Sequence, residues 1–160
     1  MRILLMGFMG CGKSTLGKLL SEELSLEFID LDELIEKKGE NYFRNAEGKY
    51  LEKILRKDNI VIAAGGGTPC YLNNMERINE KTISFYLKVS TAKLYQRLLE
   101  KNLKKNRPLL KSLSSKKELM NFIKTKLQER EKFYSMANYT INTGQKSKKK
   151  IAEEIVSYVR

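Results

Sequence analysis

The fold of this chain is decided by the stretch Gly7-Phe8-Met9-Gly10-Cys11-Gly12-Lys13-Ser14, which matches the pattern G-x-x-x-x-G-K-[ST] at every fixed position. The pattern is diagnostic only between a strand and a helix. The apolar segment Arg2–Met6 before it predicts a short buried strand, and the segment Ser14–Leu24 after it has helical spacing. The leucines that we expect on one buried face of this helix are Leu16, Leu19, Leu20 and Leu24. The stretch is therefore interpreted as a P-loop.

A P-loop binds the phosphates of a nucleotide through its backbone. Its glycines let successive N–H groups turn towards phosphate oxygens at the N-terminus of a helix, where the helix dipole favours an anion. Lys13 is expected to reach the β- and γ-phosphates, and the Ser14 hydroxyl to ligate Mg²⁺. The rival dinucleotide pattern G-x-G-x-x-G fails, because Thr15 stands where a third glycine is needed. The residues predicted to hold ATP here are Gly10, Cys11, Gly12, Lys13, Ser14 and Thr15.

Strands and helices alternate along the rest of the chain. Four further apolar segments predict strands at Leu26–Ile29, Ile60–Ala64, Thr82–Leu87 and Tyr139–Asn142. Helical patterns fall between and after them, up to about Lys57 and at Ala92–Lys105, Lys116–Tyr134 and Ser147–Val159. This alternation predicts an α/β three-layer sandwich, an α/β/α arrangement around a five-stranded parallel sheet, with ligands outside the carboxyl ends of the strands.

Two carboxylates follow the second predicted strand. Asp30 and Asp32 are two residues apart, so in an extended segment both side chains point to the same side, beside the phosphates. One could complete the Mg²⁺ coordination and the other could orient or deprotonate an attacking hydroxyl. Capping of a following helix before Glu33 is the alternative for this Asp-x-Asp, and the two functions are compatible.

A glycine triplet and three arginines complete the set of candidate residues. Gly65-Gly66-Gly67 follows a buried strand, which favours close approach of a ligand over the alternative of a tight turn into Thr68-Pro69. A phosphotransferase needs cations on the transferred oxygens and a planar fork for any substrate carboxylate, so we single out Arg44, Arg107 and Arg130. Solvated surface positions are the alternative for each of the three.

Composition excludes several classes of function. The 160 residues contain no histidine, which rules out Ser-His nucleophile pairs and His-ligated zinc. The two cysteines, Cys11 and Cys70, have no metal-ligand spacing and are expected to be free thiols in a reducing compartment. No segment has the length of a signal peptide or a membrane span, so we expect a single cytoplasmic domain, 1–160. The formal charge of +12 comes largely from lysines without interleaved aromatics, which argues against a nucleic-acid partner.

Taken in order, these residues resemble the shikimate kinase family over essentially the whole chain. The P-loop alone is shared by many NTPases, whereas the ordered combination is specific. Its further parts are Phe28-Ile29-Asp30-Leu31-Asp32, Phe43-Arg44-Asn45-Ala46-Glu47, Gly65-Gly66-Gly67, Arg107-Pro108-Leu109-Leu110, and Arg130 four residues before Tyr134.

The resemblance implies a role for each matched residue. Asp30 would help to hold Mg²⁺, and Asp32 would bind shikimate hydroxyls and act as the base. Arg44 and Arg130 would clamp the shikimate carboxylate. Arg107 would reach over the phosphates from a lid near 103–116, whose closure would exclude water. The residues expected to line the shikimate pocket are Phe43, Gly66 and Gly67, and the segment 142–146 falls where the family contacts adenine.

The chain departs from the family between Asp32 and Phe43, where members normally carry about a dozen further residues. The substrate-binding subdomain, about 32–57, is thus expected to be shortened, while ATP binding is untouched. The resemblance predicts transfer of the ATP γ-phosphoryl group to the 3-hydroxyl of shikimate by a monomer. Two rivals stay open: a kinase for gluconate or a nucleoside monophosphate, and a non-catalytic nucleotide-dependent protein that binds nucleic acid.

Overall fold

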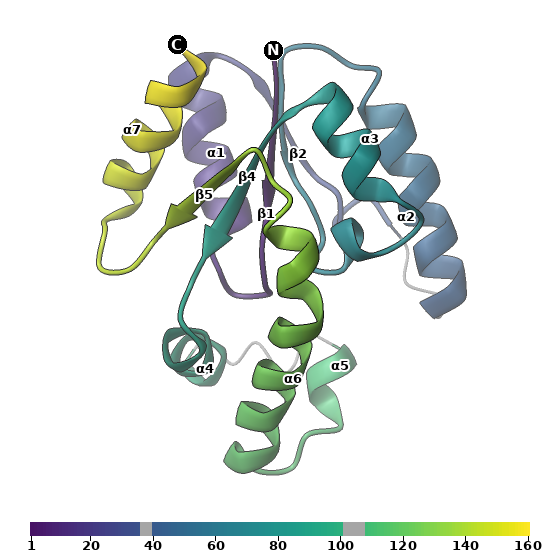
Figure 1. Ribbon diagram of the computed structural model, residues 1–160, viewed down its shortest axis with the longest axis vertical. Coiled ribbons are helices and arrows are strands. Elements are labelled where there is room, and N and C mark those ends of the chain that lie inside the picture. Colours follow the sequence, from purple (N-terminus) through teal and green to yellow (C-terminus); the bar gives the residue numbers. More distant parts are fainter. Residues whose placement is uncertain (36–39, 101–107) are drawn as a thin grey trace.

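A five-stranded parallel sheet forms the centre of the molecule in the computed structural model, which describes residues 1–35, 40–100 and 108–160 (Figure 1). The strands are β1 (Arg2–Met6), β2 (Glu27–Asp30), β3 (Ile60–Ala63), β4 (Ile83–Lys88) and β5 (Tyr139–Asn142). Their spatial order is β2-β3-β1-β4-β5, and every pairing is parallel. Leu5 pairs with Ala63 on one side and Phe85 on the other, so the carboxyl ends of the three central strands lie together. The predicted fold class is confirmed.

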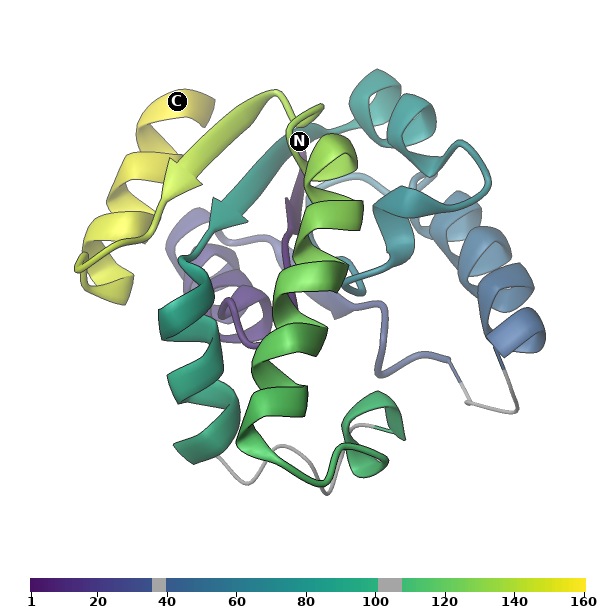
Figure 2. The same cartoon turned by 60° about the horizontal axis from the view of Figure 1, so that its bottom comes forward.

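Helices cover both faces of the sheet and its carboxyl edge. They are α1 (Lys13–Leu24), α2 (Glu40–Ile54), the short 3-10 helix η1 (Thr68–Cys70), α3 (Asn74–Lys81), α4 (Thr91–Glu100), α5 (Pro108–Lys111), α6 (Lys116–Tyr134) and α7 (Lys148–Val159). In Figure 1, α1 and α7 lie on one face, and α2 and α3 on the other. Helices α4, α5 and α6 lie below the arrowheads, and Figure 2 shows α6 crossing in front of this edge beside α4.

Alternation along the strands divides the core between the two faces. Ile3 and Leu5 of β1 pack into a cluster with α1, α4, α6 and α7. Leu4 and Met6, which alternate with Ile3 and Leu5 along the strand, pack into a second cluster with α2 and α3. All four side chains are fully buried. A strand buried on both faces reads as a continuous apolar run, which is why Arg2–Met6 could be predicted to its exact limits.

The predicted helix after the P-loop is correct in extent to one residue but not in its buried face. Leu16 and Leu20 are buried, whereas Leu19 is 37% exposed. Residues four apart share a helical face more closely than residues three apart, and the buried residues of α1 are Leu16, Gly17 and Leu20. The inclusion of Leu19 in the core was therefore wrong.

Other differences from the expected elements concern their ends. Turns at 31–34 follow β2, and α2 is described from Glu40 to Ile54, so it ends before the predicted limit at Lys57. The part of the predicted helical stretch at 36–39 lies outside the described residues. The predicted helix from Ala92 is described to Glu100, and its end at Lys105 lies outside the described residues. The helix from Lys116 to Tyr134 has the predicted limits, because a capping box between Ser115 and Glu118 fixes its start.

Candidate functional site

The P-loop connects β1 to α1 at the carboxyl edge of the sheet. Gly7 has φ of 148° and Gly12 has φ of 100°, positive values that glycine adopts far more readily than other residues. Gly12 is the residue directly before α1, so the loop meets the helix through a conformation that other residues rarely adopt. The local backbone thus explains why the pattern requires glycine at these positions.

Lys13 folds back over this loop. Its Nζ donates to the carbonyl oxygens of Gly7 (2.9 Å) and Phe8 (3.3 Å). The ammonium group is thus held at the mouth of the loop as a point charge for an anion.

Ser14 and Asp30 meet beside the loop. The Ser14 hydroxyl donates to Asp30 Oδ2 at 2.5 Å, and the backbone N–H of Asp32 donates to Asp30 Oδ1 at 3.1 Å. A hydroxyl and a carboxylate are hard oxygen donors of the kind that Mg²⁺ prefers, and a Mg²⁺ site of this type takes its remaining ligands from water and phosphate. The donor set therefore fits Mg²⁺. Among the described residues there is no group of three or more His, Cys, Asp or Glu side chains that could hold a metal by themselves.

A pocket of about 220 Å³ opens at this point. It is lined by Met9, Gly10, Gly12, Lys13, Ser14, Thr15, Asp30, Asp32, Ala64, Gly66 and Arg97. Five of the six residues predicted to hold ATP belong to this lining. Cys11 lies behind it: its side chain is buried, and its N–H donates to the Phe8 carbonyl within the loop at 3.1 Å.

Arg97 is a residue of the site that the sequence analysis missed. From α4, its Nη1 donates to the carbonyl oxygens of Gly10 (3.1 Å) and Cys11 (3.3 Å), and its side chain lines the pocket. The fold brings it there from more than 80 positions further along the chain. A lone arginine on a charged helix carries no local signal of this contact.

The glycine triplet follows β3, the neighbour of β1, and reaches the same edge. A Cβ built on Gly65 would lie 2.6 Å from Asp32 Oδ1, and one on Gly66 would lie 3.2 Å from Arg130 Nη1. Arg130 is only 7% exposed, and its Cζ lies 5.8 Å from the ring centroid of Phe8. The structure thus brings Asp32 and Arg130 together around the triplet.

Arg44 lies against the third glycine of the triplet, Gly67. A Cβ on Gly67 would lie 2.5 Å from Arg44 Nη2, so this close approach requires glycine. Arg44 Nη1 donates to Glu47 Oε2 at 2.8 Å, and the other oxygen of Glu47 accepts a short hydrogen bond from the Thr68 hydroxyl. Glu47 is fully buried and ties α2 to η1. Its position three residues after Arg44 is an ion-pair spacing that the sequence analysis did not use.

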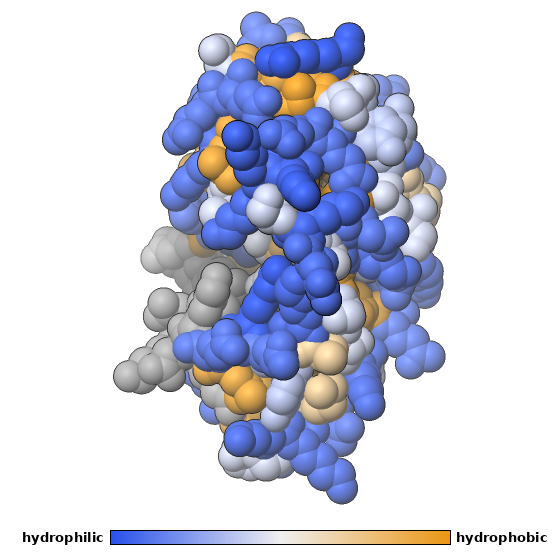
Figure 3. Space-filling view, turned by 90° about the vertical axis from the view of Figure 1, so that its left-hand side faces the viewer, coloured by the Kyte–Doolittle hydropathy of each residue, from blue (hydrophilic) through white to orange (hydrophobic). Residues whose placement is uncertain are grey.

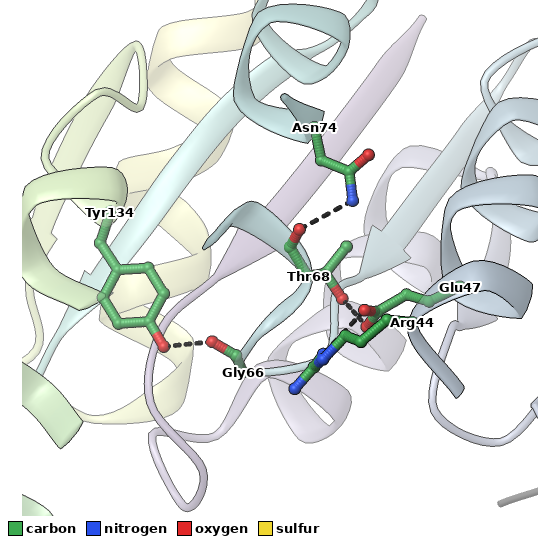
Figure 4. A network of polar contacts seen from close by, with 6 residues as sticks. All are labelled: Arg44, Glu47, Gly66, Thr68, Asn74 and Tyr134. Carbon is green, nitrogen blue, oxygen red and sulfur yellow. Dashed lines mark hydrogen bonds and ion pairs between the residues drawn. The ribbon is translucent and has the colours of Figure 1, made fainter. Parts of the chain in front are cut away.

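Tyr134 supports the triplet from α6. Its hydroxyl donates a short hydrogen bond to the Gly66 carbonyl (Figure 4), and burial raises the pKa of this phenol well above its usual range. The group therefore remains a donor at any pH at which the protein is studied. Its spacing from Arg130 places both on one face of α6, aimed at the same loop.

The remaining candidates have different outcomes. Phe43, a residue of α2, is partly buried against the core, with its ring centroid 5.1 Å from Arg44 Cζ. Arg107 and most of the N-terminal half of the expected lid, 103–107, lie outside the described residues. Burial raises the pKa of the Cys70 thiol to about 11, although the positive charges of Arg130 and Arg44 oppose part of this shift.

The sequence model of the family described as "Shikimate kinase" matches residues 9–160. This chain belongs to the shikimate kinase family. A shikimate kinase of Phocaeicola vulgatus is 39% identical over 171 aligned positions that cover 99% of this chain and 96% of the relative. A shikimate kinase of Azobacteroides pseudotrichonymphae is 43% identical and covers 86% of each chain.

Solved structures of the family have the same architecture. A shikimate kinase of Bacteroides thetaiotaomicron superposes with a TM-score of 0.89 at 34% identity, covering 99% of this chain and 97% of the other. The Acinetobacter baumannii shikimate kinase in complex with shikimate gives 0.88 at 32% identity, covering 99% and 92%. A gluconokinase of Sinorhizobium meliloti, at 17% identity and 0.65, shares the fold alone.

The surface gives two further observations. None of the helices in the described parts of the chain is long and apolar enough to cross a membrane. The face that carries α7 is largely hydrophilic (Figure 3). Two of its lysines are paired within the same region: Lys146 with Glu154 at 2.7 Å and Lys149 with Glu153 at 4.0 Å. Part of the basic charge that the sequence concentrates here is therefore balanced locally.

Proposed function

We propose that this enzyme transfers the γ-phosphoryl group of ATP to the 3-hydroxyl of shikimate, giving shikimate 3-phosphate and ADP. The observation that carries the proposal is the placement of two guanidinium groups, Arg44 and Arg130, against adjacent glycines, Gly67 and Gly66, beside the P-loop pocket. Two planar cations in one place suit a carboxylate, and shikimate is a carboxylic acid with ring hydroxyls.

The nucleotide side uses the P-loop. We propose that the backbone N–H groups of Gly10–Thr15 and the ammonium group of Lys13 bind the phosphates. Ser14 and Asp30 would hold Mg²⁺, Asp30 directly or through water. When bound, the ion neutralises negative charge on the phosphate oxygens.

The acceptor side is built around the glycine triplet. Arg44 and Arg130 would bind the carboxylate, while Gly66, Gly67 and Phe43 line the ring. Asp32, which lies against Gly65 at the pocket wall, would accept the proton of the attacking hydroxyl. With the carboxylate held by the two arginines and Asp32 at the pocket wall, a single hydroxyl of the bound acceptor would be presented to the phosphate.

Phosphoryl transfer needs positioning and charge stabilisation more than covalent chemistry. Lys13 and Arg130 lie on the P-loop side and the acceptor side of the transferred group. We propose that Arg107, from a lid at about 103–116 within a single 1–160 domain, adds a third cation and that lid closure excludes water.

The shortened acceptor subdomain is the departure that bears most on this function. The alignment with the Phocaeicola relative spans 171 positions and this chain has 160 residues, so at least 11 positions of the alignment have no counterpart here. We propose that this gap lies between Asp32 and Phe43, within 32–57. The clamp residues are retained in spite of the gap, which supports retained recognition of the carboxylate. We further propose that the enzyme acts as a cytoplasmic monomer.

The test is an ADP-release assay with Mg²⁺-ATP and a panel of acceptors: shikimate, gluconate, nucleoside monophosphates and none. We expect release that depends on shikimate, with shikimate 3-phosphate identified by mass spectrometry. Turnover of gluconate or a nucleoside monophosphate without turnover of shikimate would overturn the proposal. Tight, salt-sensitive binding of nucleic acid without any transfer would support the non-catalytic rival instead.

A further inference from the structure

One aromatic side chain next to the acceptor side has no part in the arrangement described so far. Arg44 Cζ lies 4.2 Å from the centroid of the Tyr71 ring, over its face, and closer than it lies to the Phe43 ring at 5.1 Å. A guanidinium group over the face of a tyrosine is attracted by the ring quadrupole. Tyr71 is nevertheless 39% exposed, so packing in the core does not explain the position of this ring.

The backbone after Tyr71 is held in an unusual conformation. Leu72 and Asn73 have φ of 54° and 53°, two consecutive residues other than glycine in the left-handed region. Such a conformation persists only where the surroundings over-determine it. Here the Asn74 side chain donates to the Thr68 carbonyl at 2.9 Å, which closes the turn onto η1 (Figure 4).

Helix α2 contacts two successive residues of this turn, Tyr71 and Leu72. Arg44 lies over the Tyr71 ring, and a Cβ on Gly48 would lie 2.9 Å from Leu72 Cδ1. Arg44 and Gly48 are four residues apart and share one face of the helix. Gly48, which weakens α2 by about 1 kcal/mol relative to alanine, thus leaves room for the Leu72 side chain on the same face of the helix.

We propose that Tyr71 is a positioning residue for Arg44, whose ring fixes the guanidinium group beside Gly67 in the orientation that receives the acceptor's carboxylate. This inference rests on the proposed function and deepens it at the same site. The groups that confine Arg44 then include the Tyr71 ring through its face, the Glu47 carboxylate through Nη1, and the Gly67 backbone through close contact. The hydrogen bond to Glu47 fixes one edge of the guanidinium group. The Tyr71 ring then restricts rotation of the guanidinium group about this hydrogen bond.

The energetic consequence falls on binding of the acceptor. An arginine that loses the ring samples more rotamers, and ordering it again on binding weakens affinity. Tyr71 is not among the residues that line the nucleotide pocket. Acceptor KM should therefore rise while kcat and the ATP KM stay unchanged, which is the signature of lost ground-state binding.

The experiment compares Tyr71→Ala, Tyr71→Leu and Tyr71→Phe with wild type under saturating ATP. We expect the shikimate KM to rise about threefold to tenfold in the Ala and Leu variants, and to stay within about twofold in the Phe variant, which keeps the ring face. The matched control is Tyr50→Ala, since Tyr50 on α2 is 40% exposed, and it should leave both KM values unchanged. If Tyr71→Ala does not fold, as judged by circular dichroism, the Leu variant carries the test.

A double-mutant cycle separates positioning from general structural support. In an Arg44→Ala background, Tyr71→Leu should raise the shikimate KM no further. An equal rise in both backgrounds, a parallel rise in the ATP KM, or a Phe variant as impaired as the Leu variant would overturn the inference. If the wild-type enzyme turns over shikimate and the Tyr71 variants have the same shikimate KM, this inference alone is contradicted. If the wild-type enzyme does not turn over shikimate, the proposed function is contradicted as well.

Discussion

The nucleotide side and the acceptor side of this site are specified in different ways. The phosphate-binding groups of the nucleotide side come mainly from one contiguous stretch, Gly7–Ser14, in which the backbone itself provides the binding groups, while Asp30 and Arg97 join it from other elements. The acceptor side brings together side chains from α2, α6 and the segment after β3, and each depends on a partner from another element: Arg44 on Glu47 and Tyr71, Arg130 on the space at Gly66. A contiguous site tolerates change elsewhere in the chain, whereas an assembled site depends on every element that contributes to it.

The largest effect that we expect is on the nucleotide side. Lys13→Ala should lower kcat by about 10³-fold while leaving the fold intact, because the ammonium group stabilises charge on the transferred phosphoryl group and supports no core contact. The matched control is Lys18→Ala, an exposed lysine one turn further along α1, which should retain activity. Steady-state kinetics with Mg²⁺-ATP measure both. Full activity of Lys13→Ala would contradict the proposed role of Lys13 in binding the phosphates.

A smaller and more selective effect is expected from the assembled side. Arg130→Ala should raise the shikimate KM by about tenfold to hundredfold, the loss expected for a hydrogen bond between charged groups, and change the ATP KM far less. Arg77→Ala on the exposed side of α3 is the control. Equal effects on both KM values would argue against a carboxylate role for Arg130.

Two glycine variants sharpen the comparison between the sides. Gly67 has φ of −96°, so Gly67→Ala introduces a steric conflict with Arg44 without backbone strain, and we expect a rise of about tenfold in the shikimate KM alone. Gly12→Ala meets no atom within 4 Å but must adopt φ of 100°, so its effect should fall on the ATP KM. The reverse assignment of these two effects would contradict the proposed division of the site.

The features that could be predicted from the sequence are the contiguous ones, and those that could not are assembled from distant elements. The P-loop, the strand Arg2–Met6 and the helix Lys116–Tyr134 were predicted accurately because their signals are local: a fixed motif, an apolar run and helical spacing. Leu19 was placed in the core wrongly because spacing alone does not show which helical row faces the sheet.

The residues that were missed have no local signal. Arg97 reaches the P-loop from α4, and Tyr71 reaches Arg44 from the turn after η1, both through the tertiary fold. Glu47 was quoted within a motif, but its buried contact with Thr68 depends on how α2 packs against η1. Such partners require the packing of whole elements, which periodicity and composition do not encode.

The smallest effect concerns Cys70, near the two clamp arginines. Because burial raises its pKa to about 11, the thiolate fraction at pH 8 is lower than for an ordinary cysteine, and alkylation by iodoacetamide should be slow and still rise with pH above 9. Peptide mapping by mass spectrometry distinguishes Cys70 from the buried Cys11. An alkylation rate that levels off near pH 9 would contradict the burial of this thiol beside the acceptor side.

The central claim is that Arg44 and Arg130 form a carboxylate clamp that makes shikimate the acceptor, and the most direct measurement compares shikimate with its methyl ester. The account predicts that the wild-type enzyme phosphorylates shikimate with a kcat/KM at least about tenfold higher than the ester, and that Arg130→Ala removes most of this preference. Equal use of the acid and the ester by the wild-type enzyme, or an undiminished preference in Arg130→Ala, would contradict it.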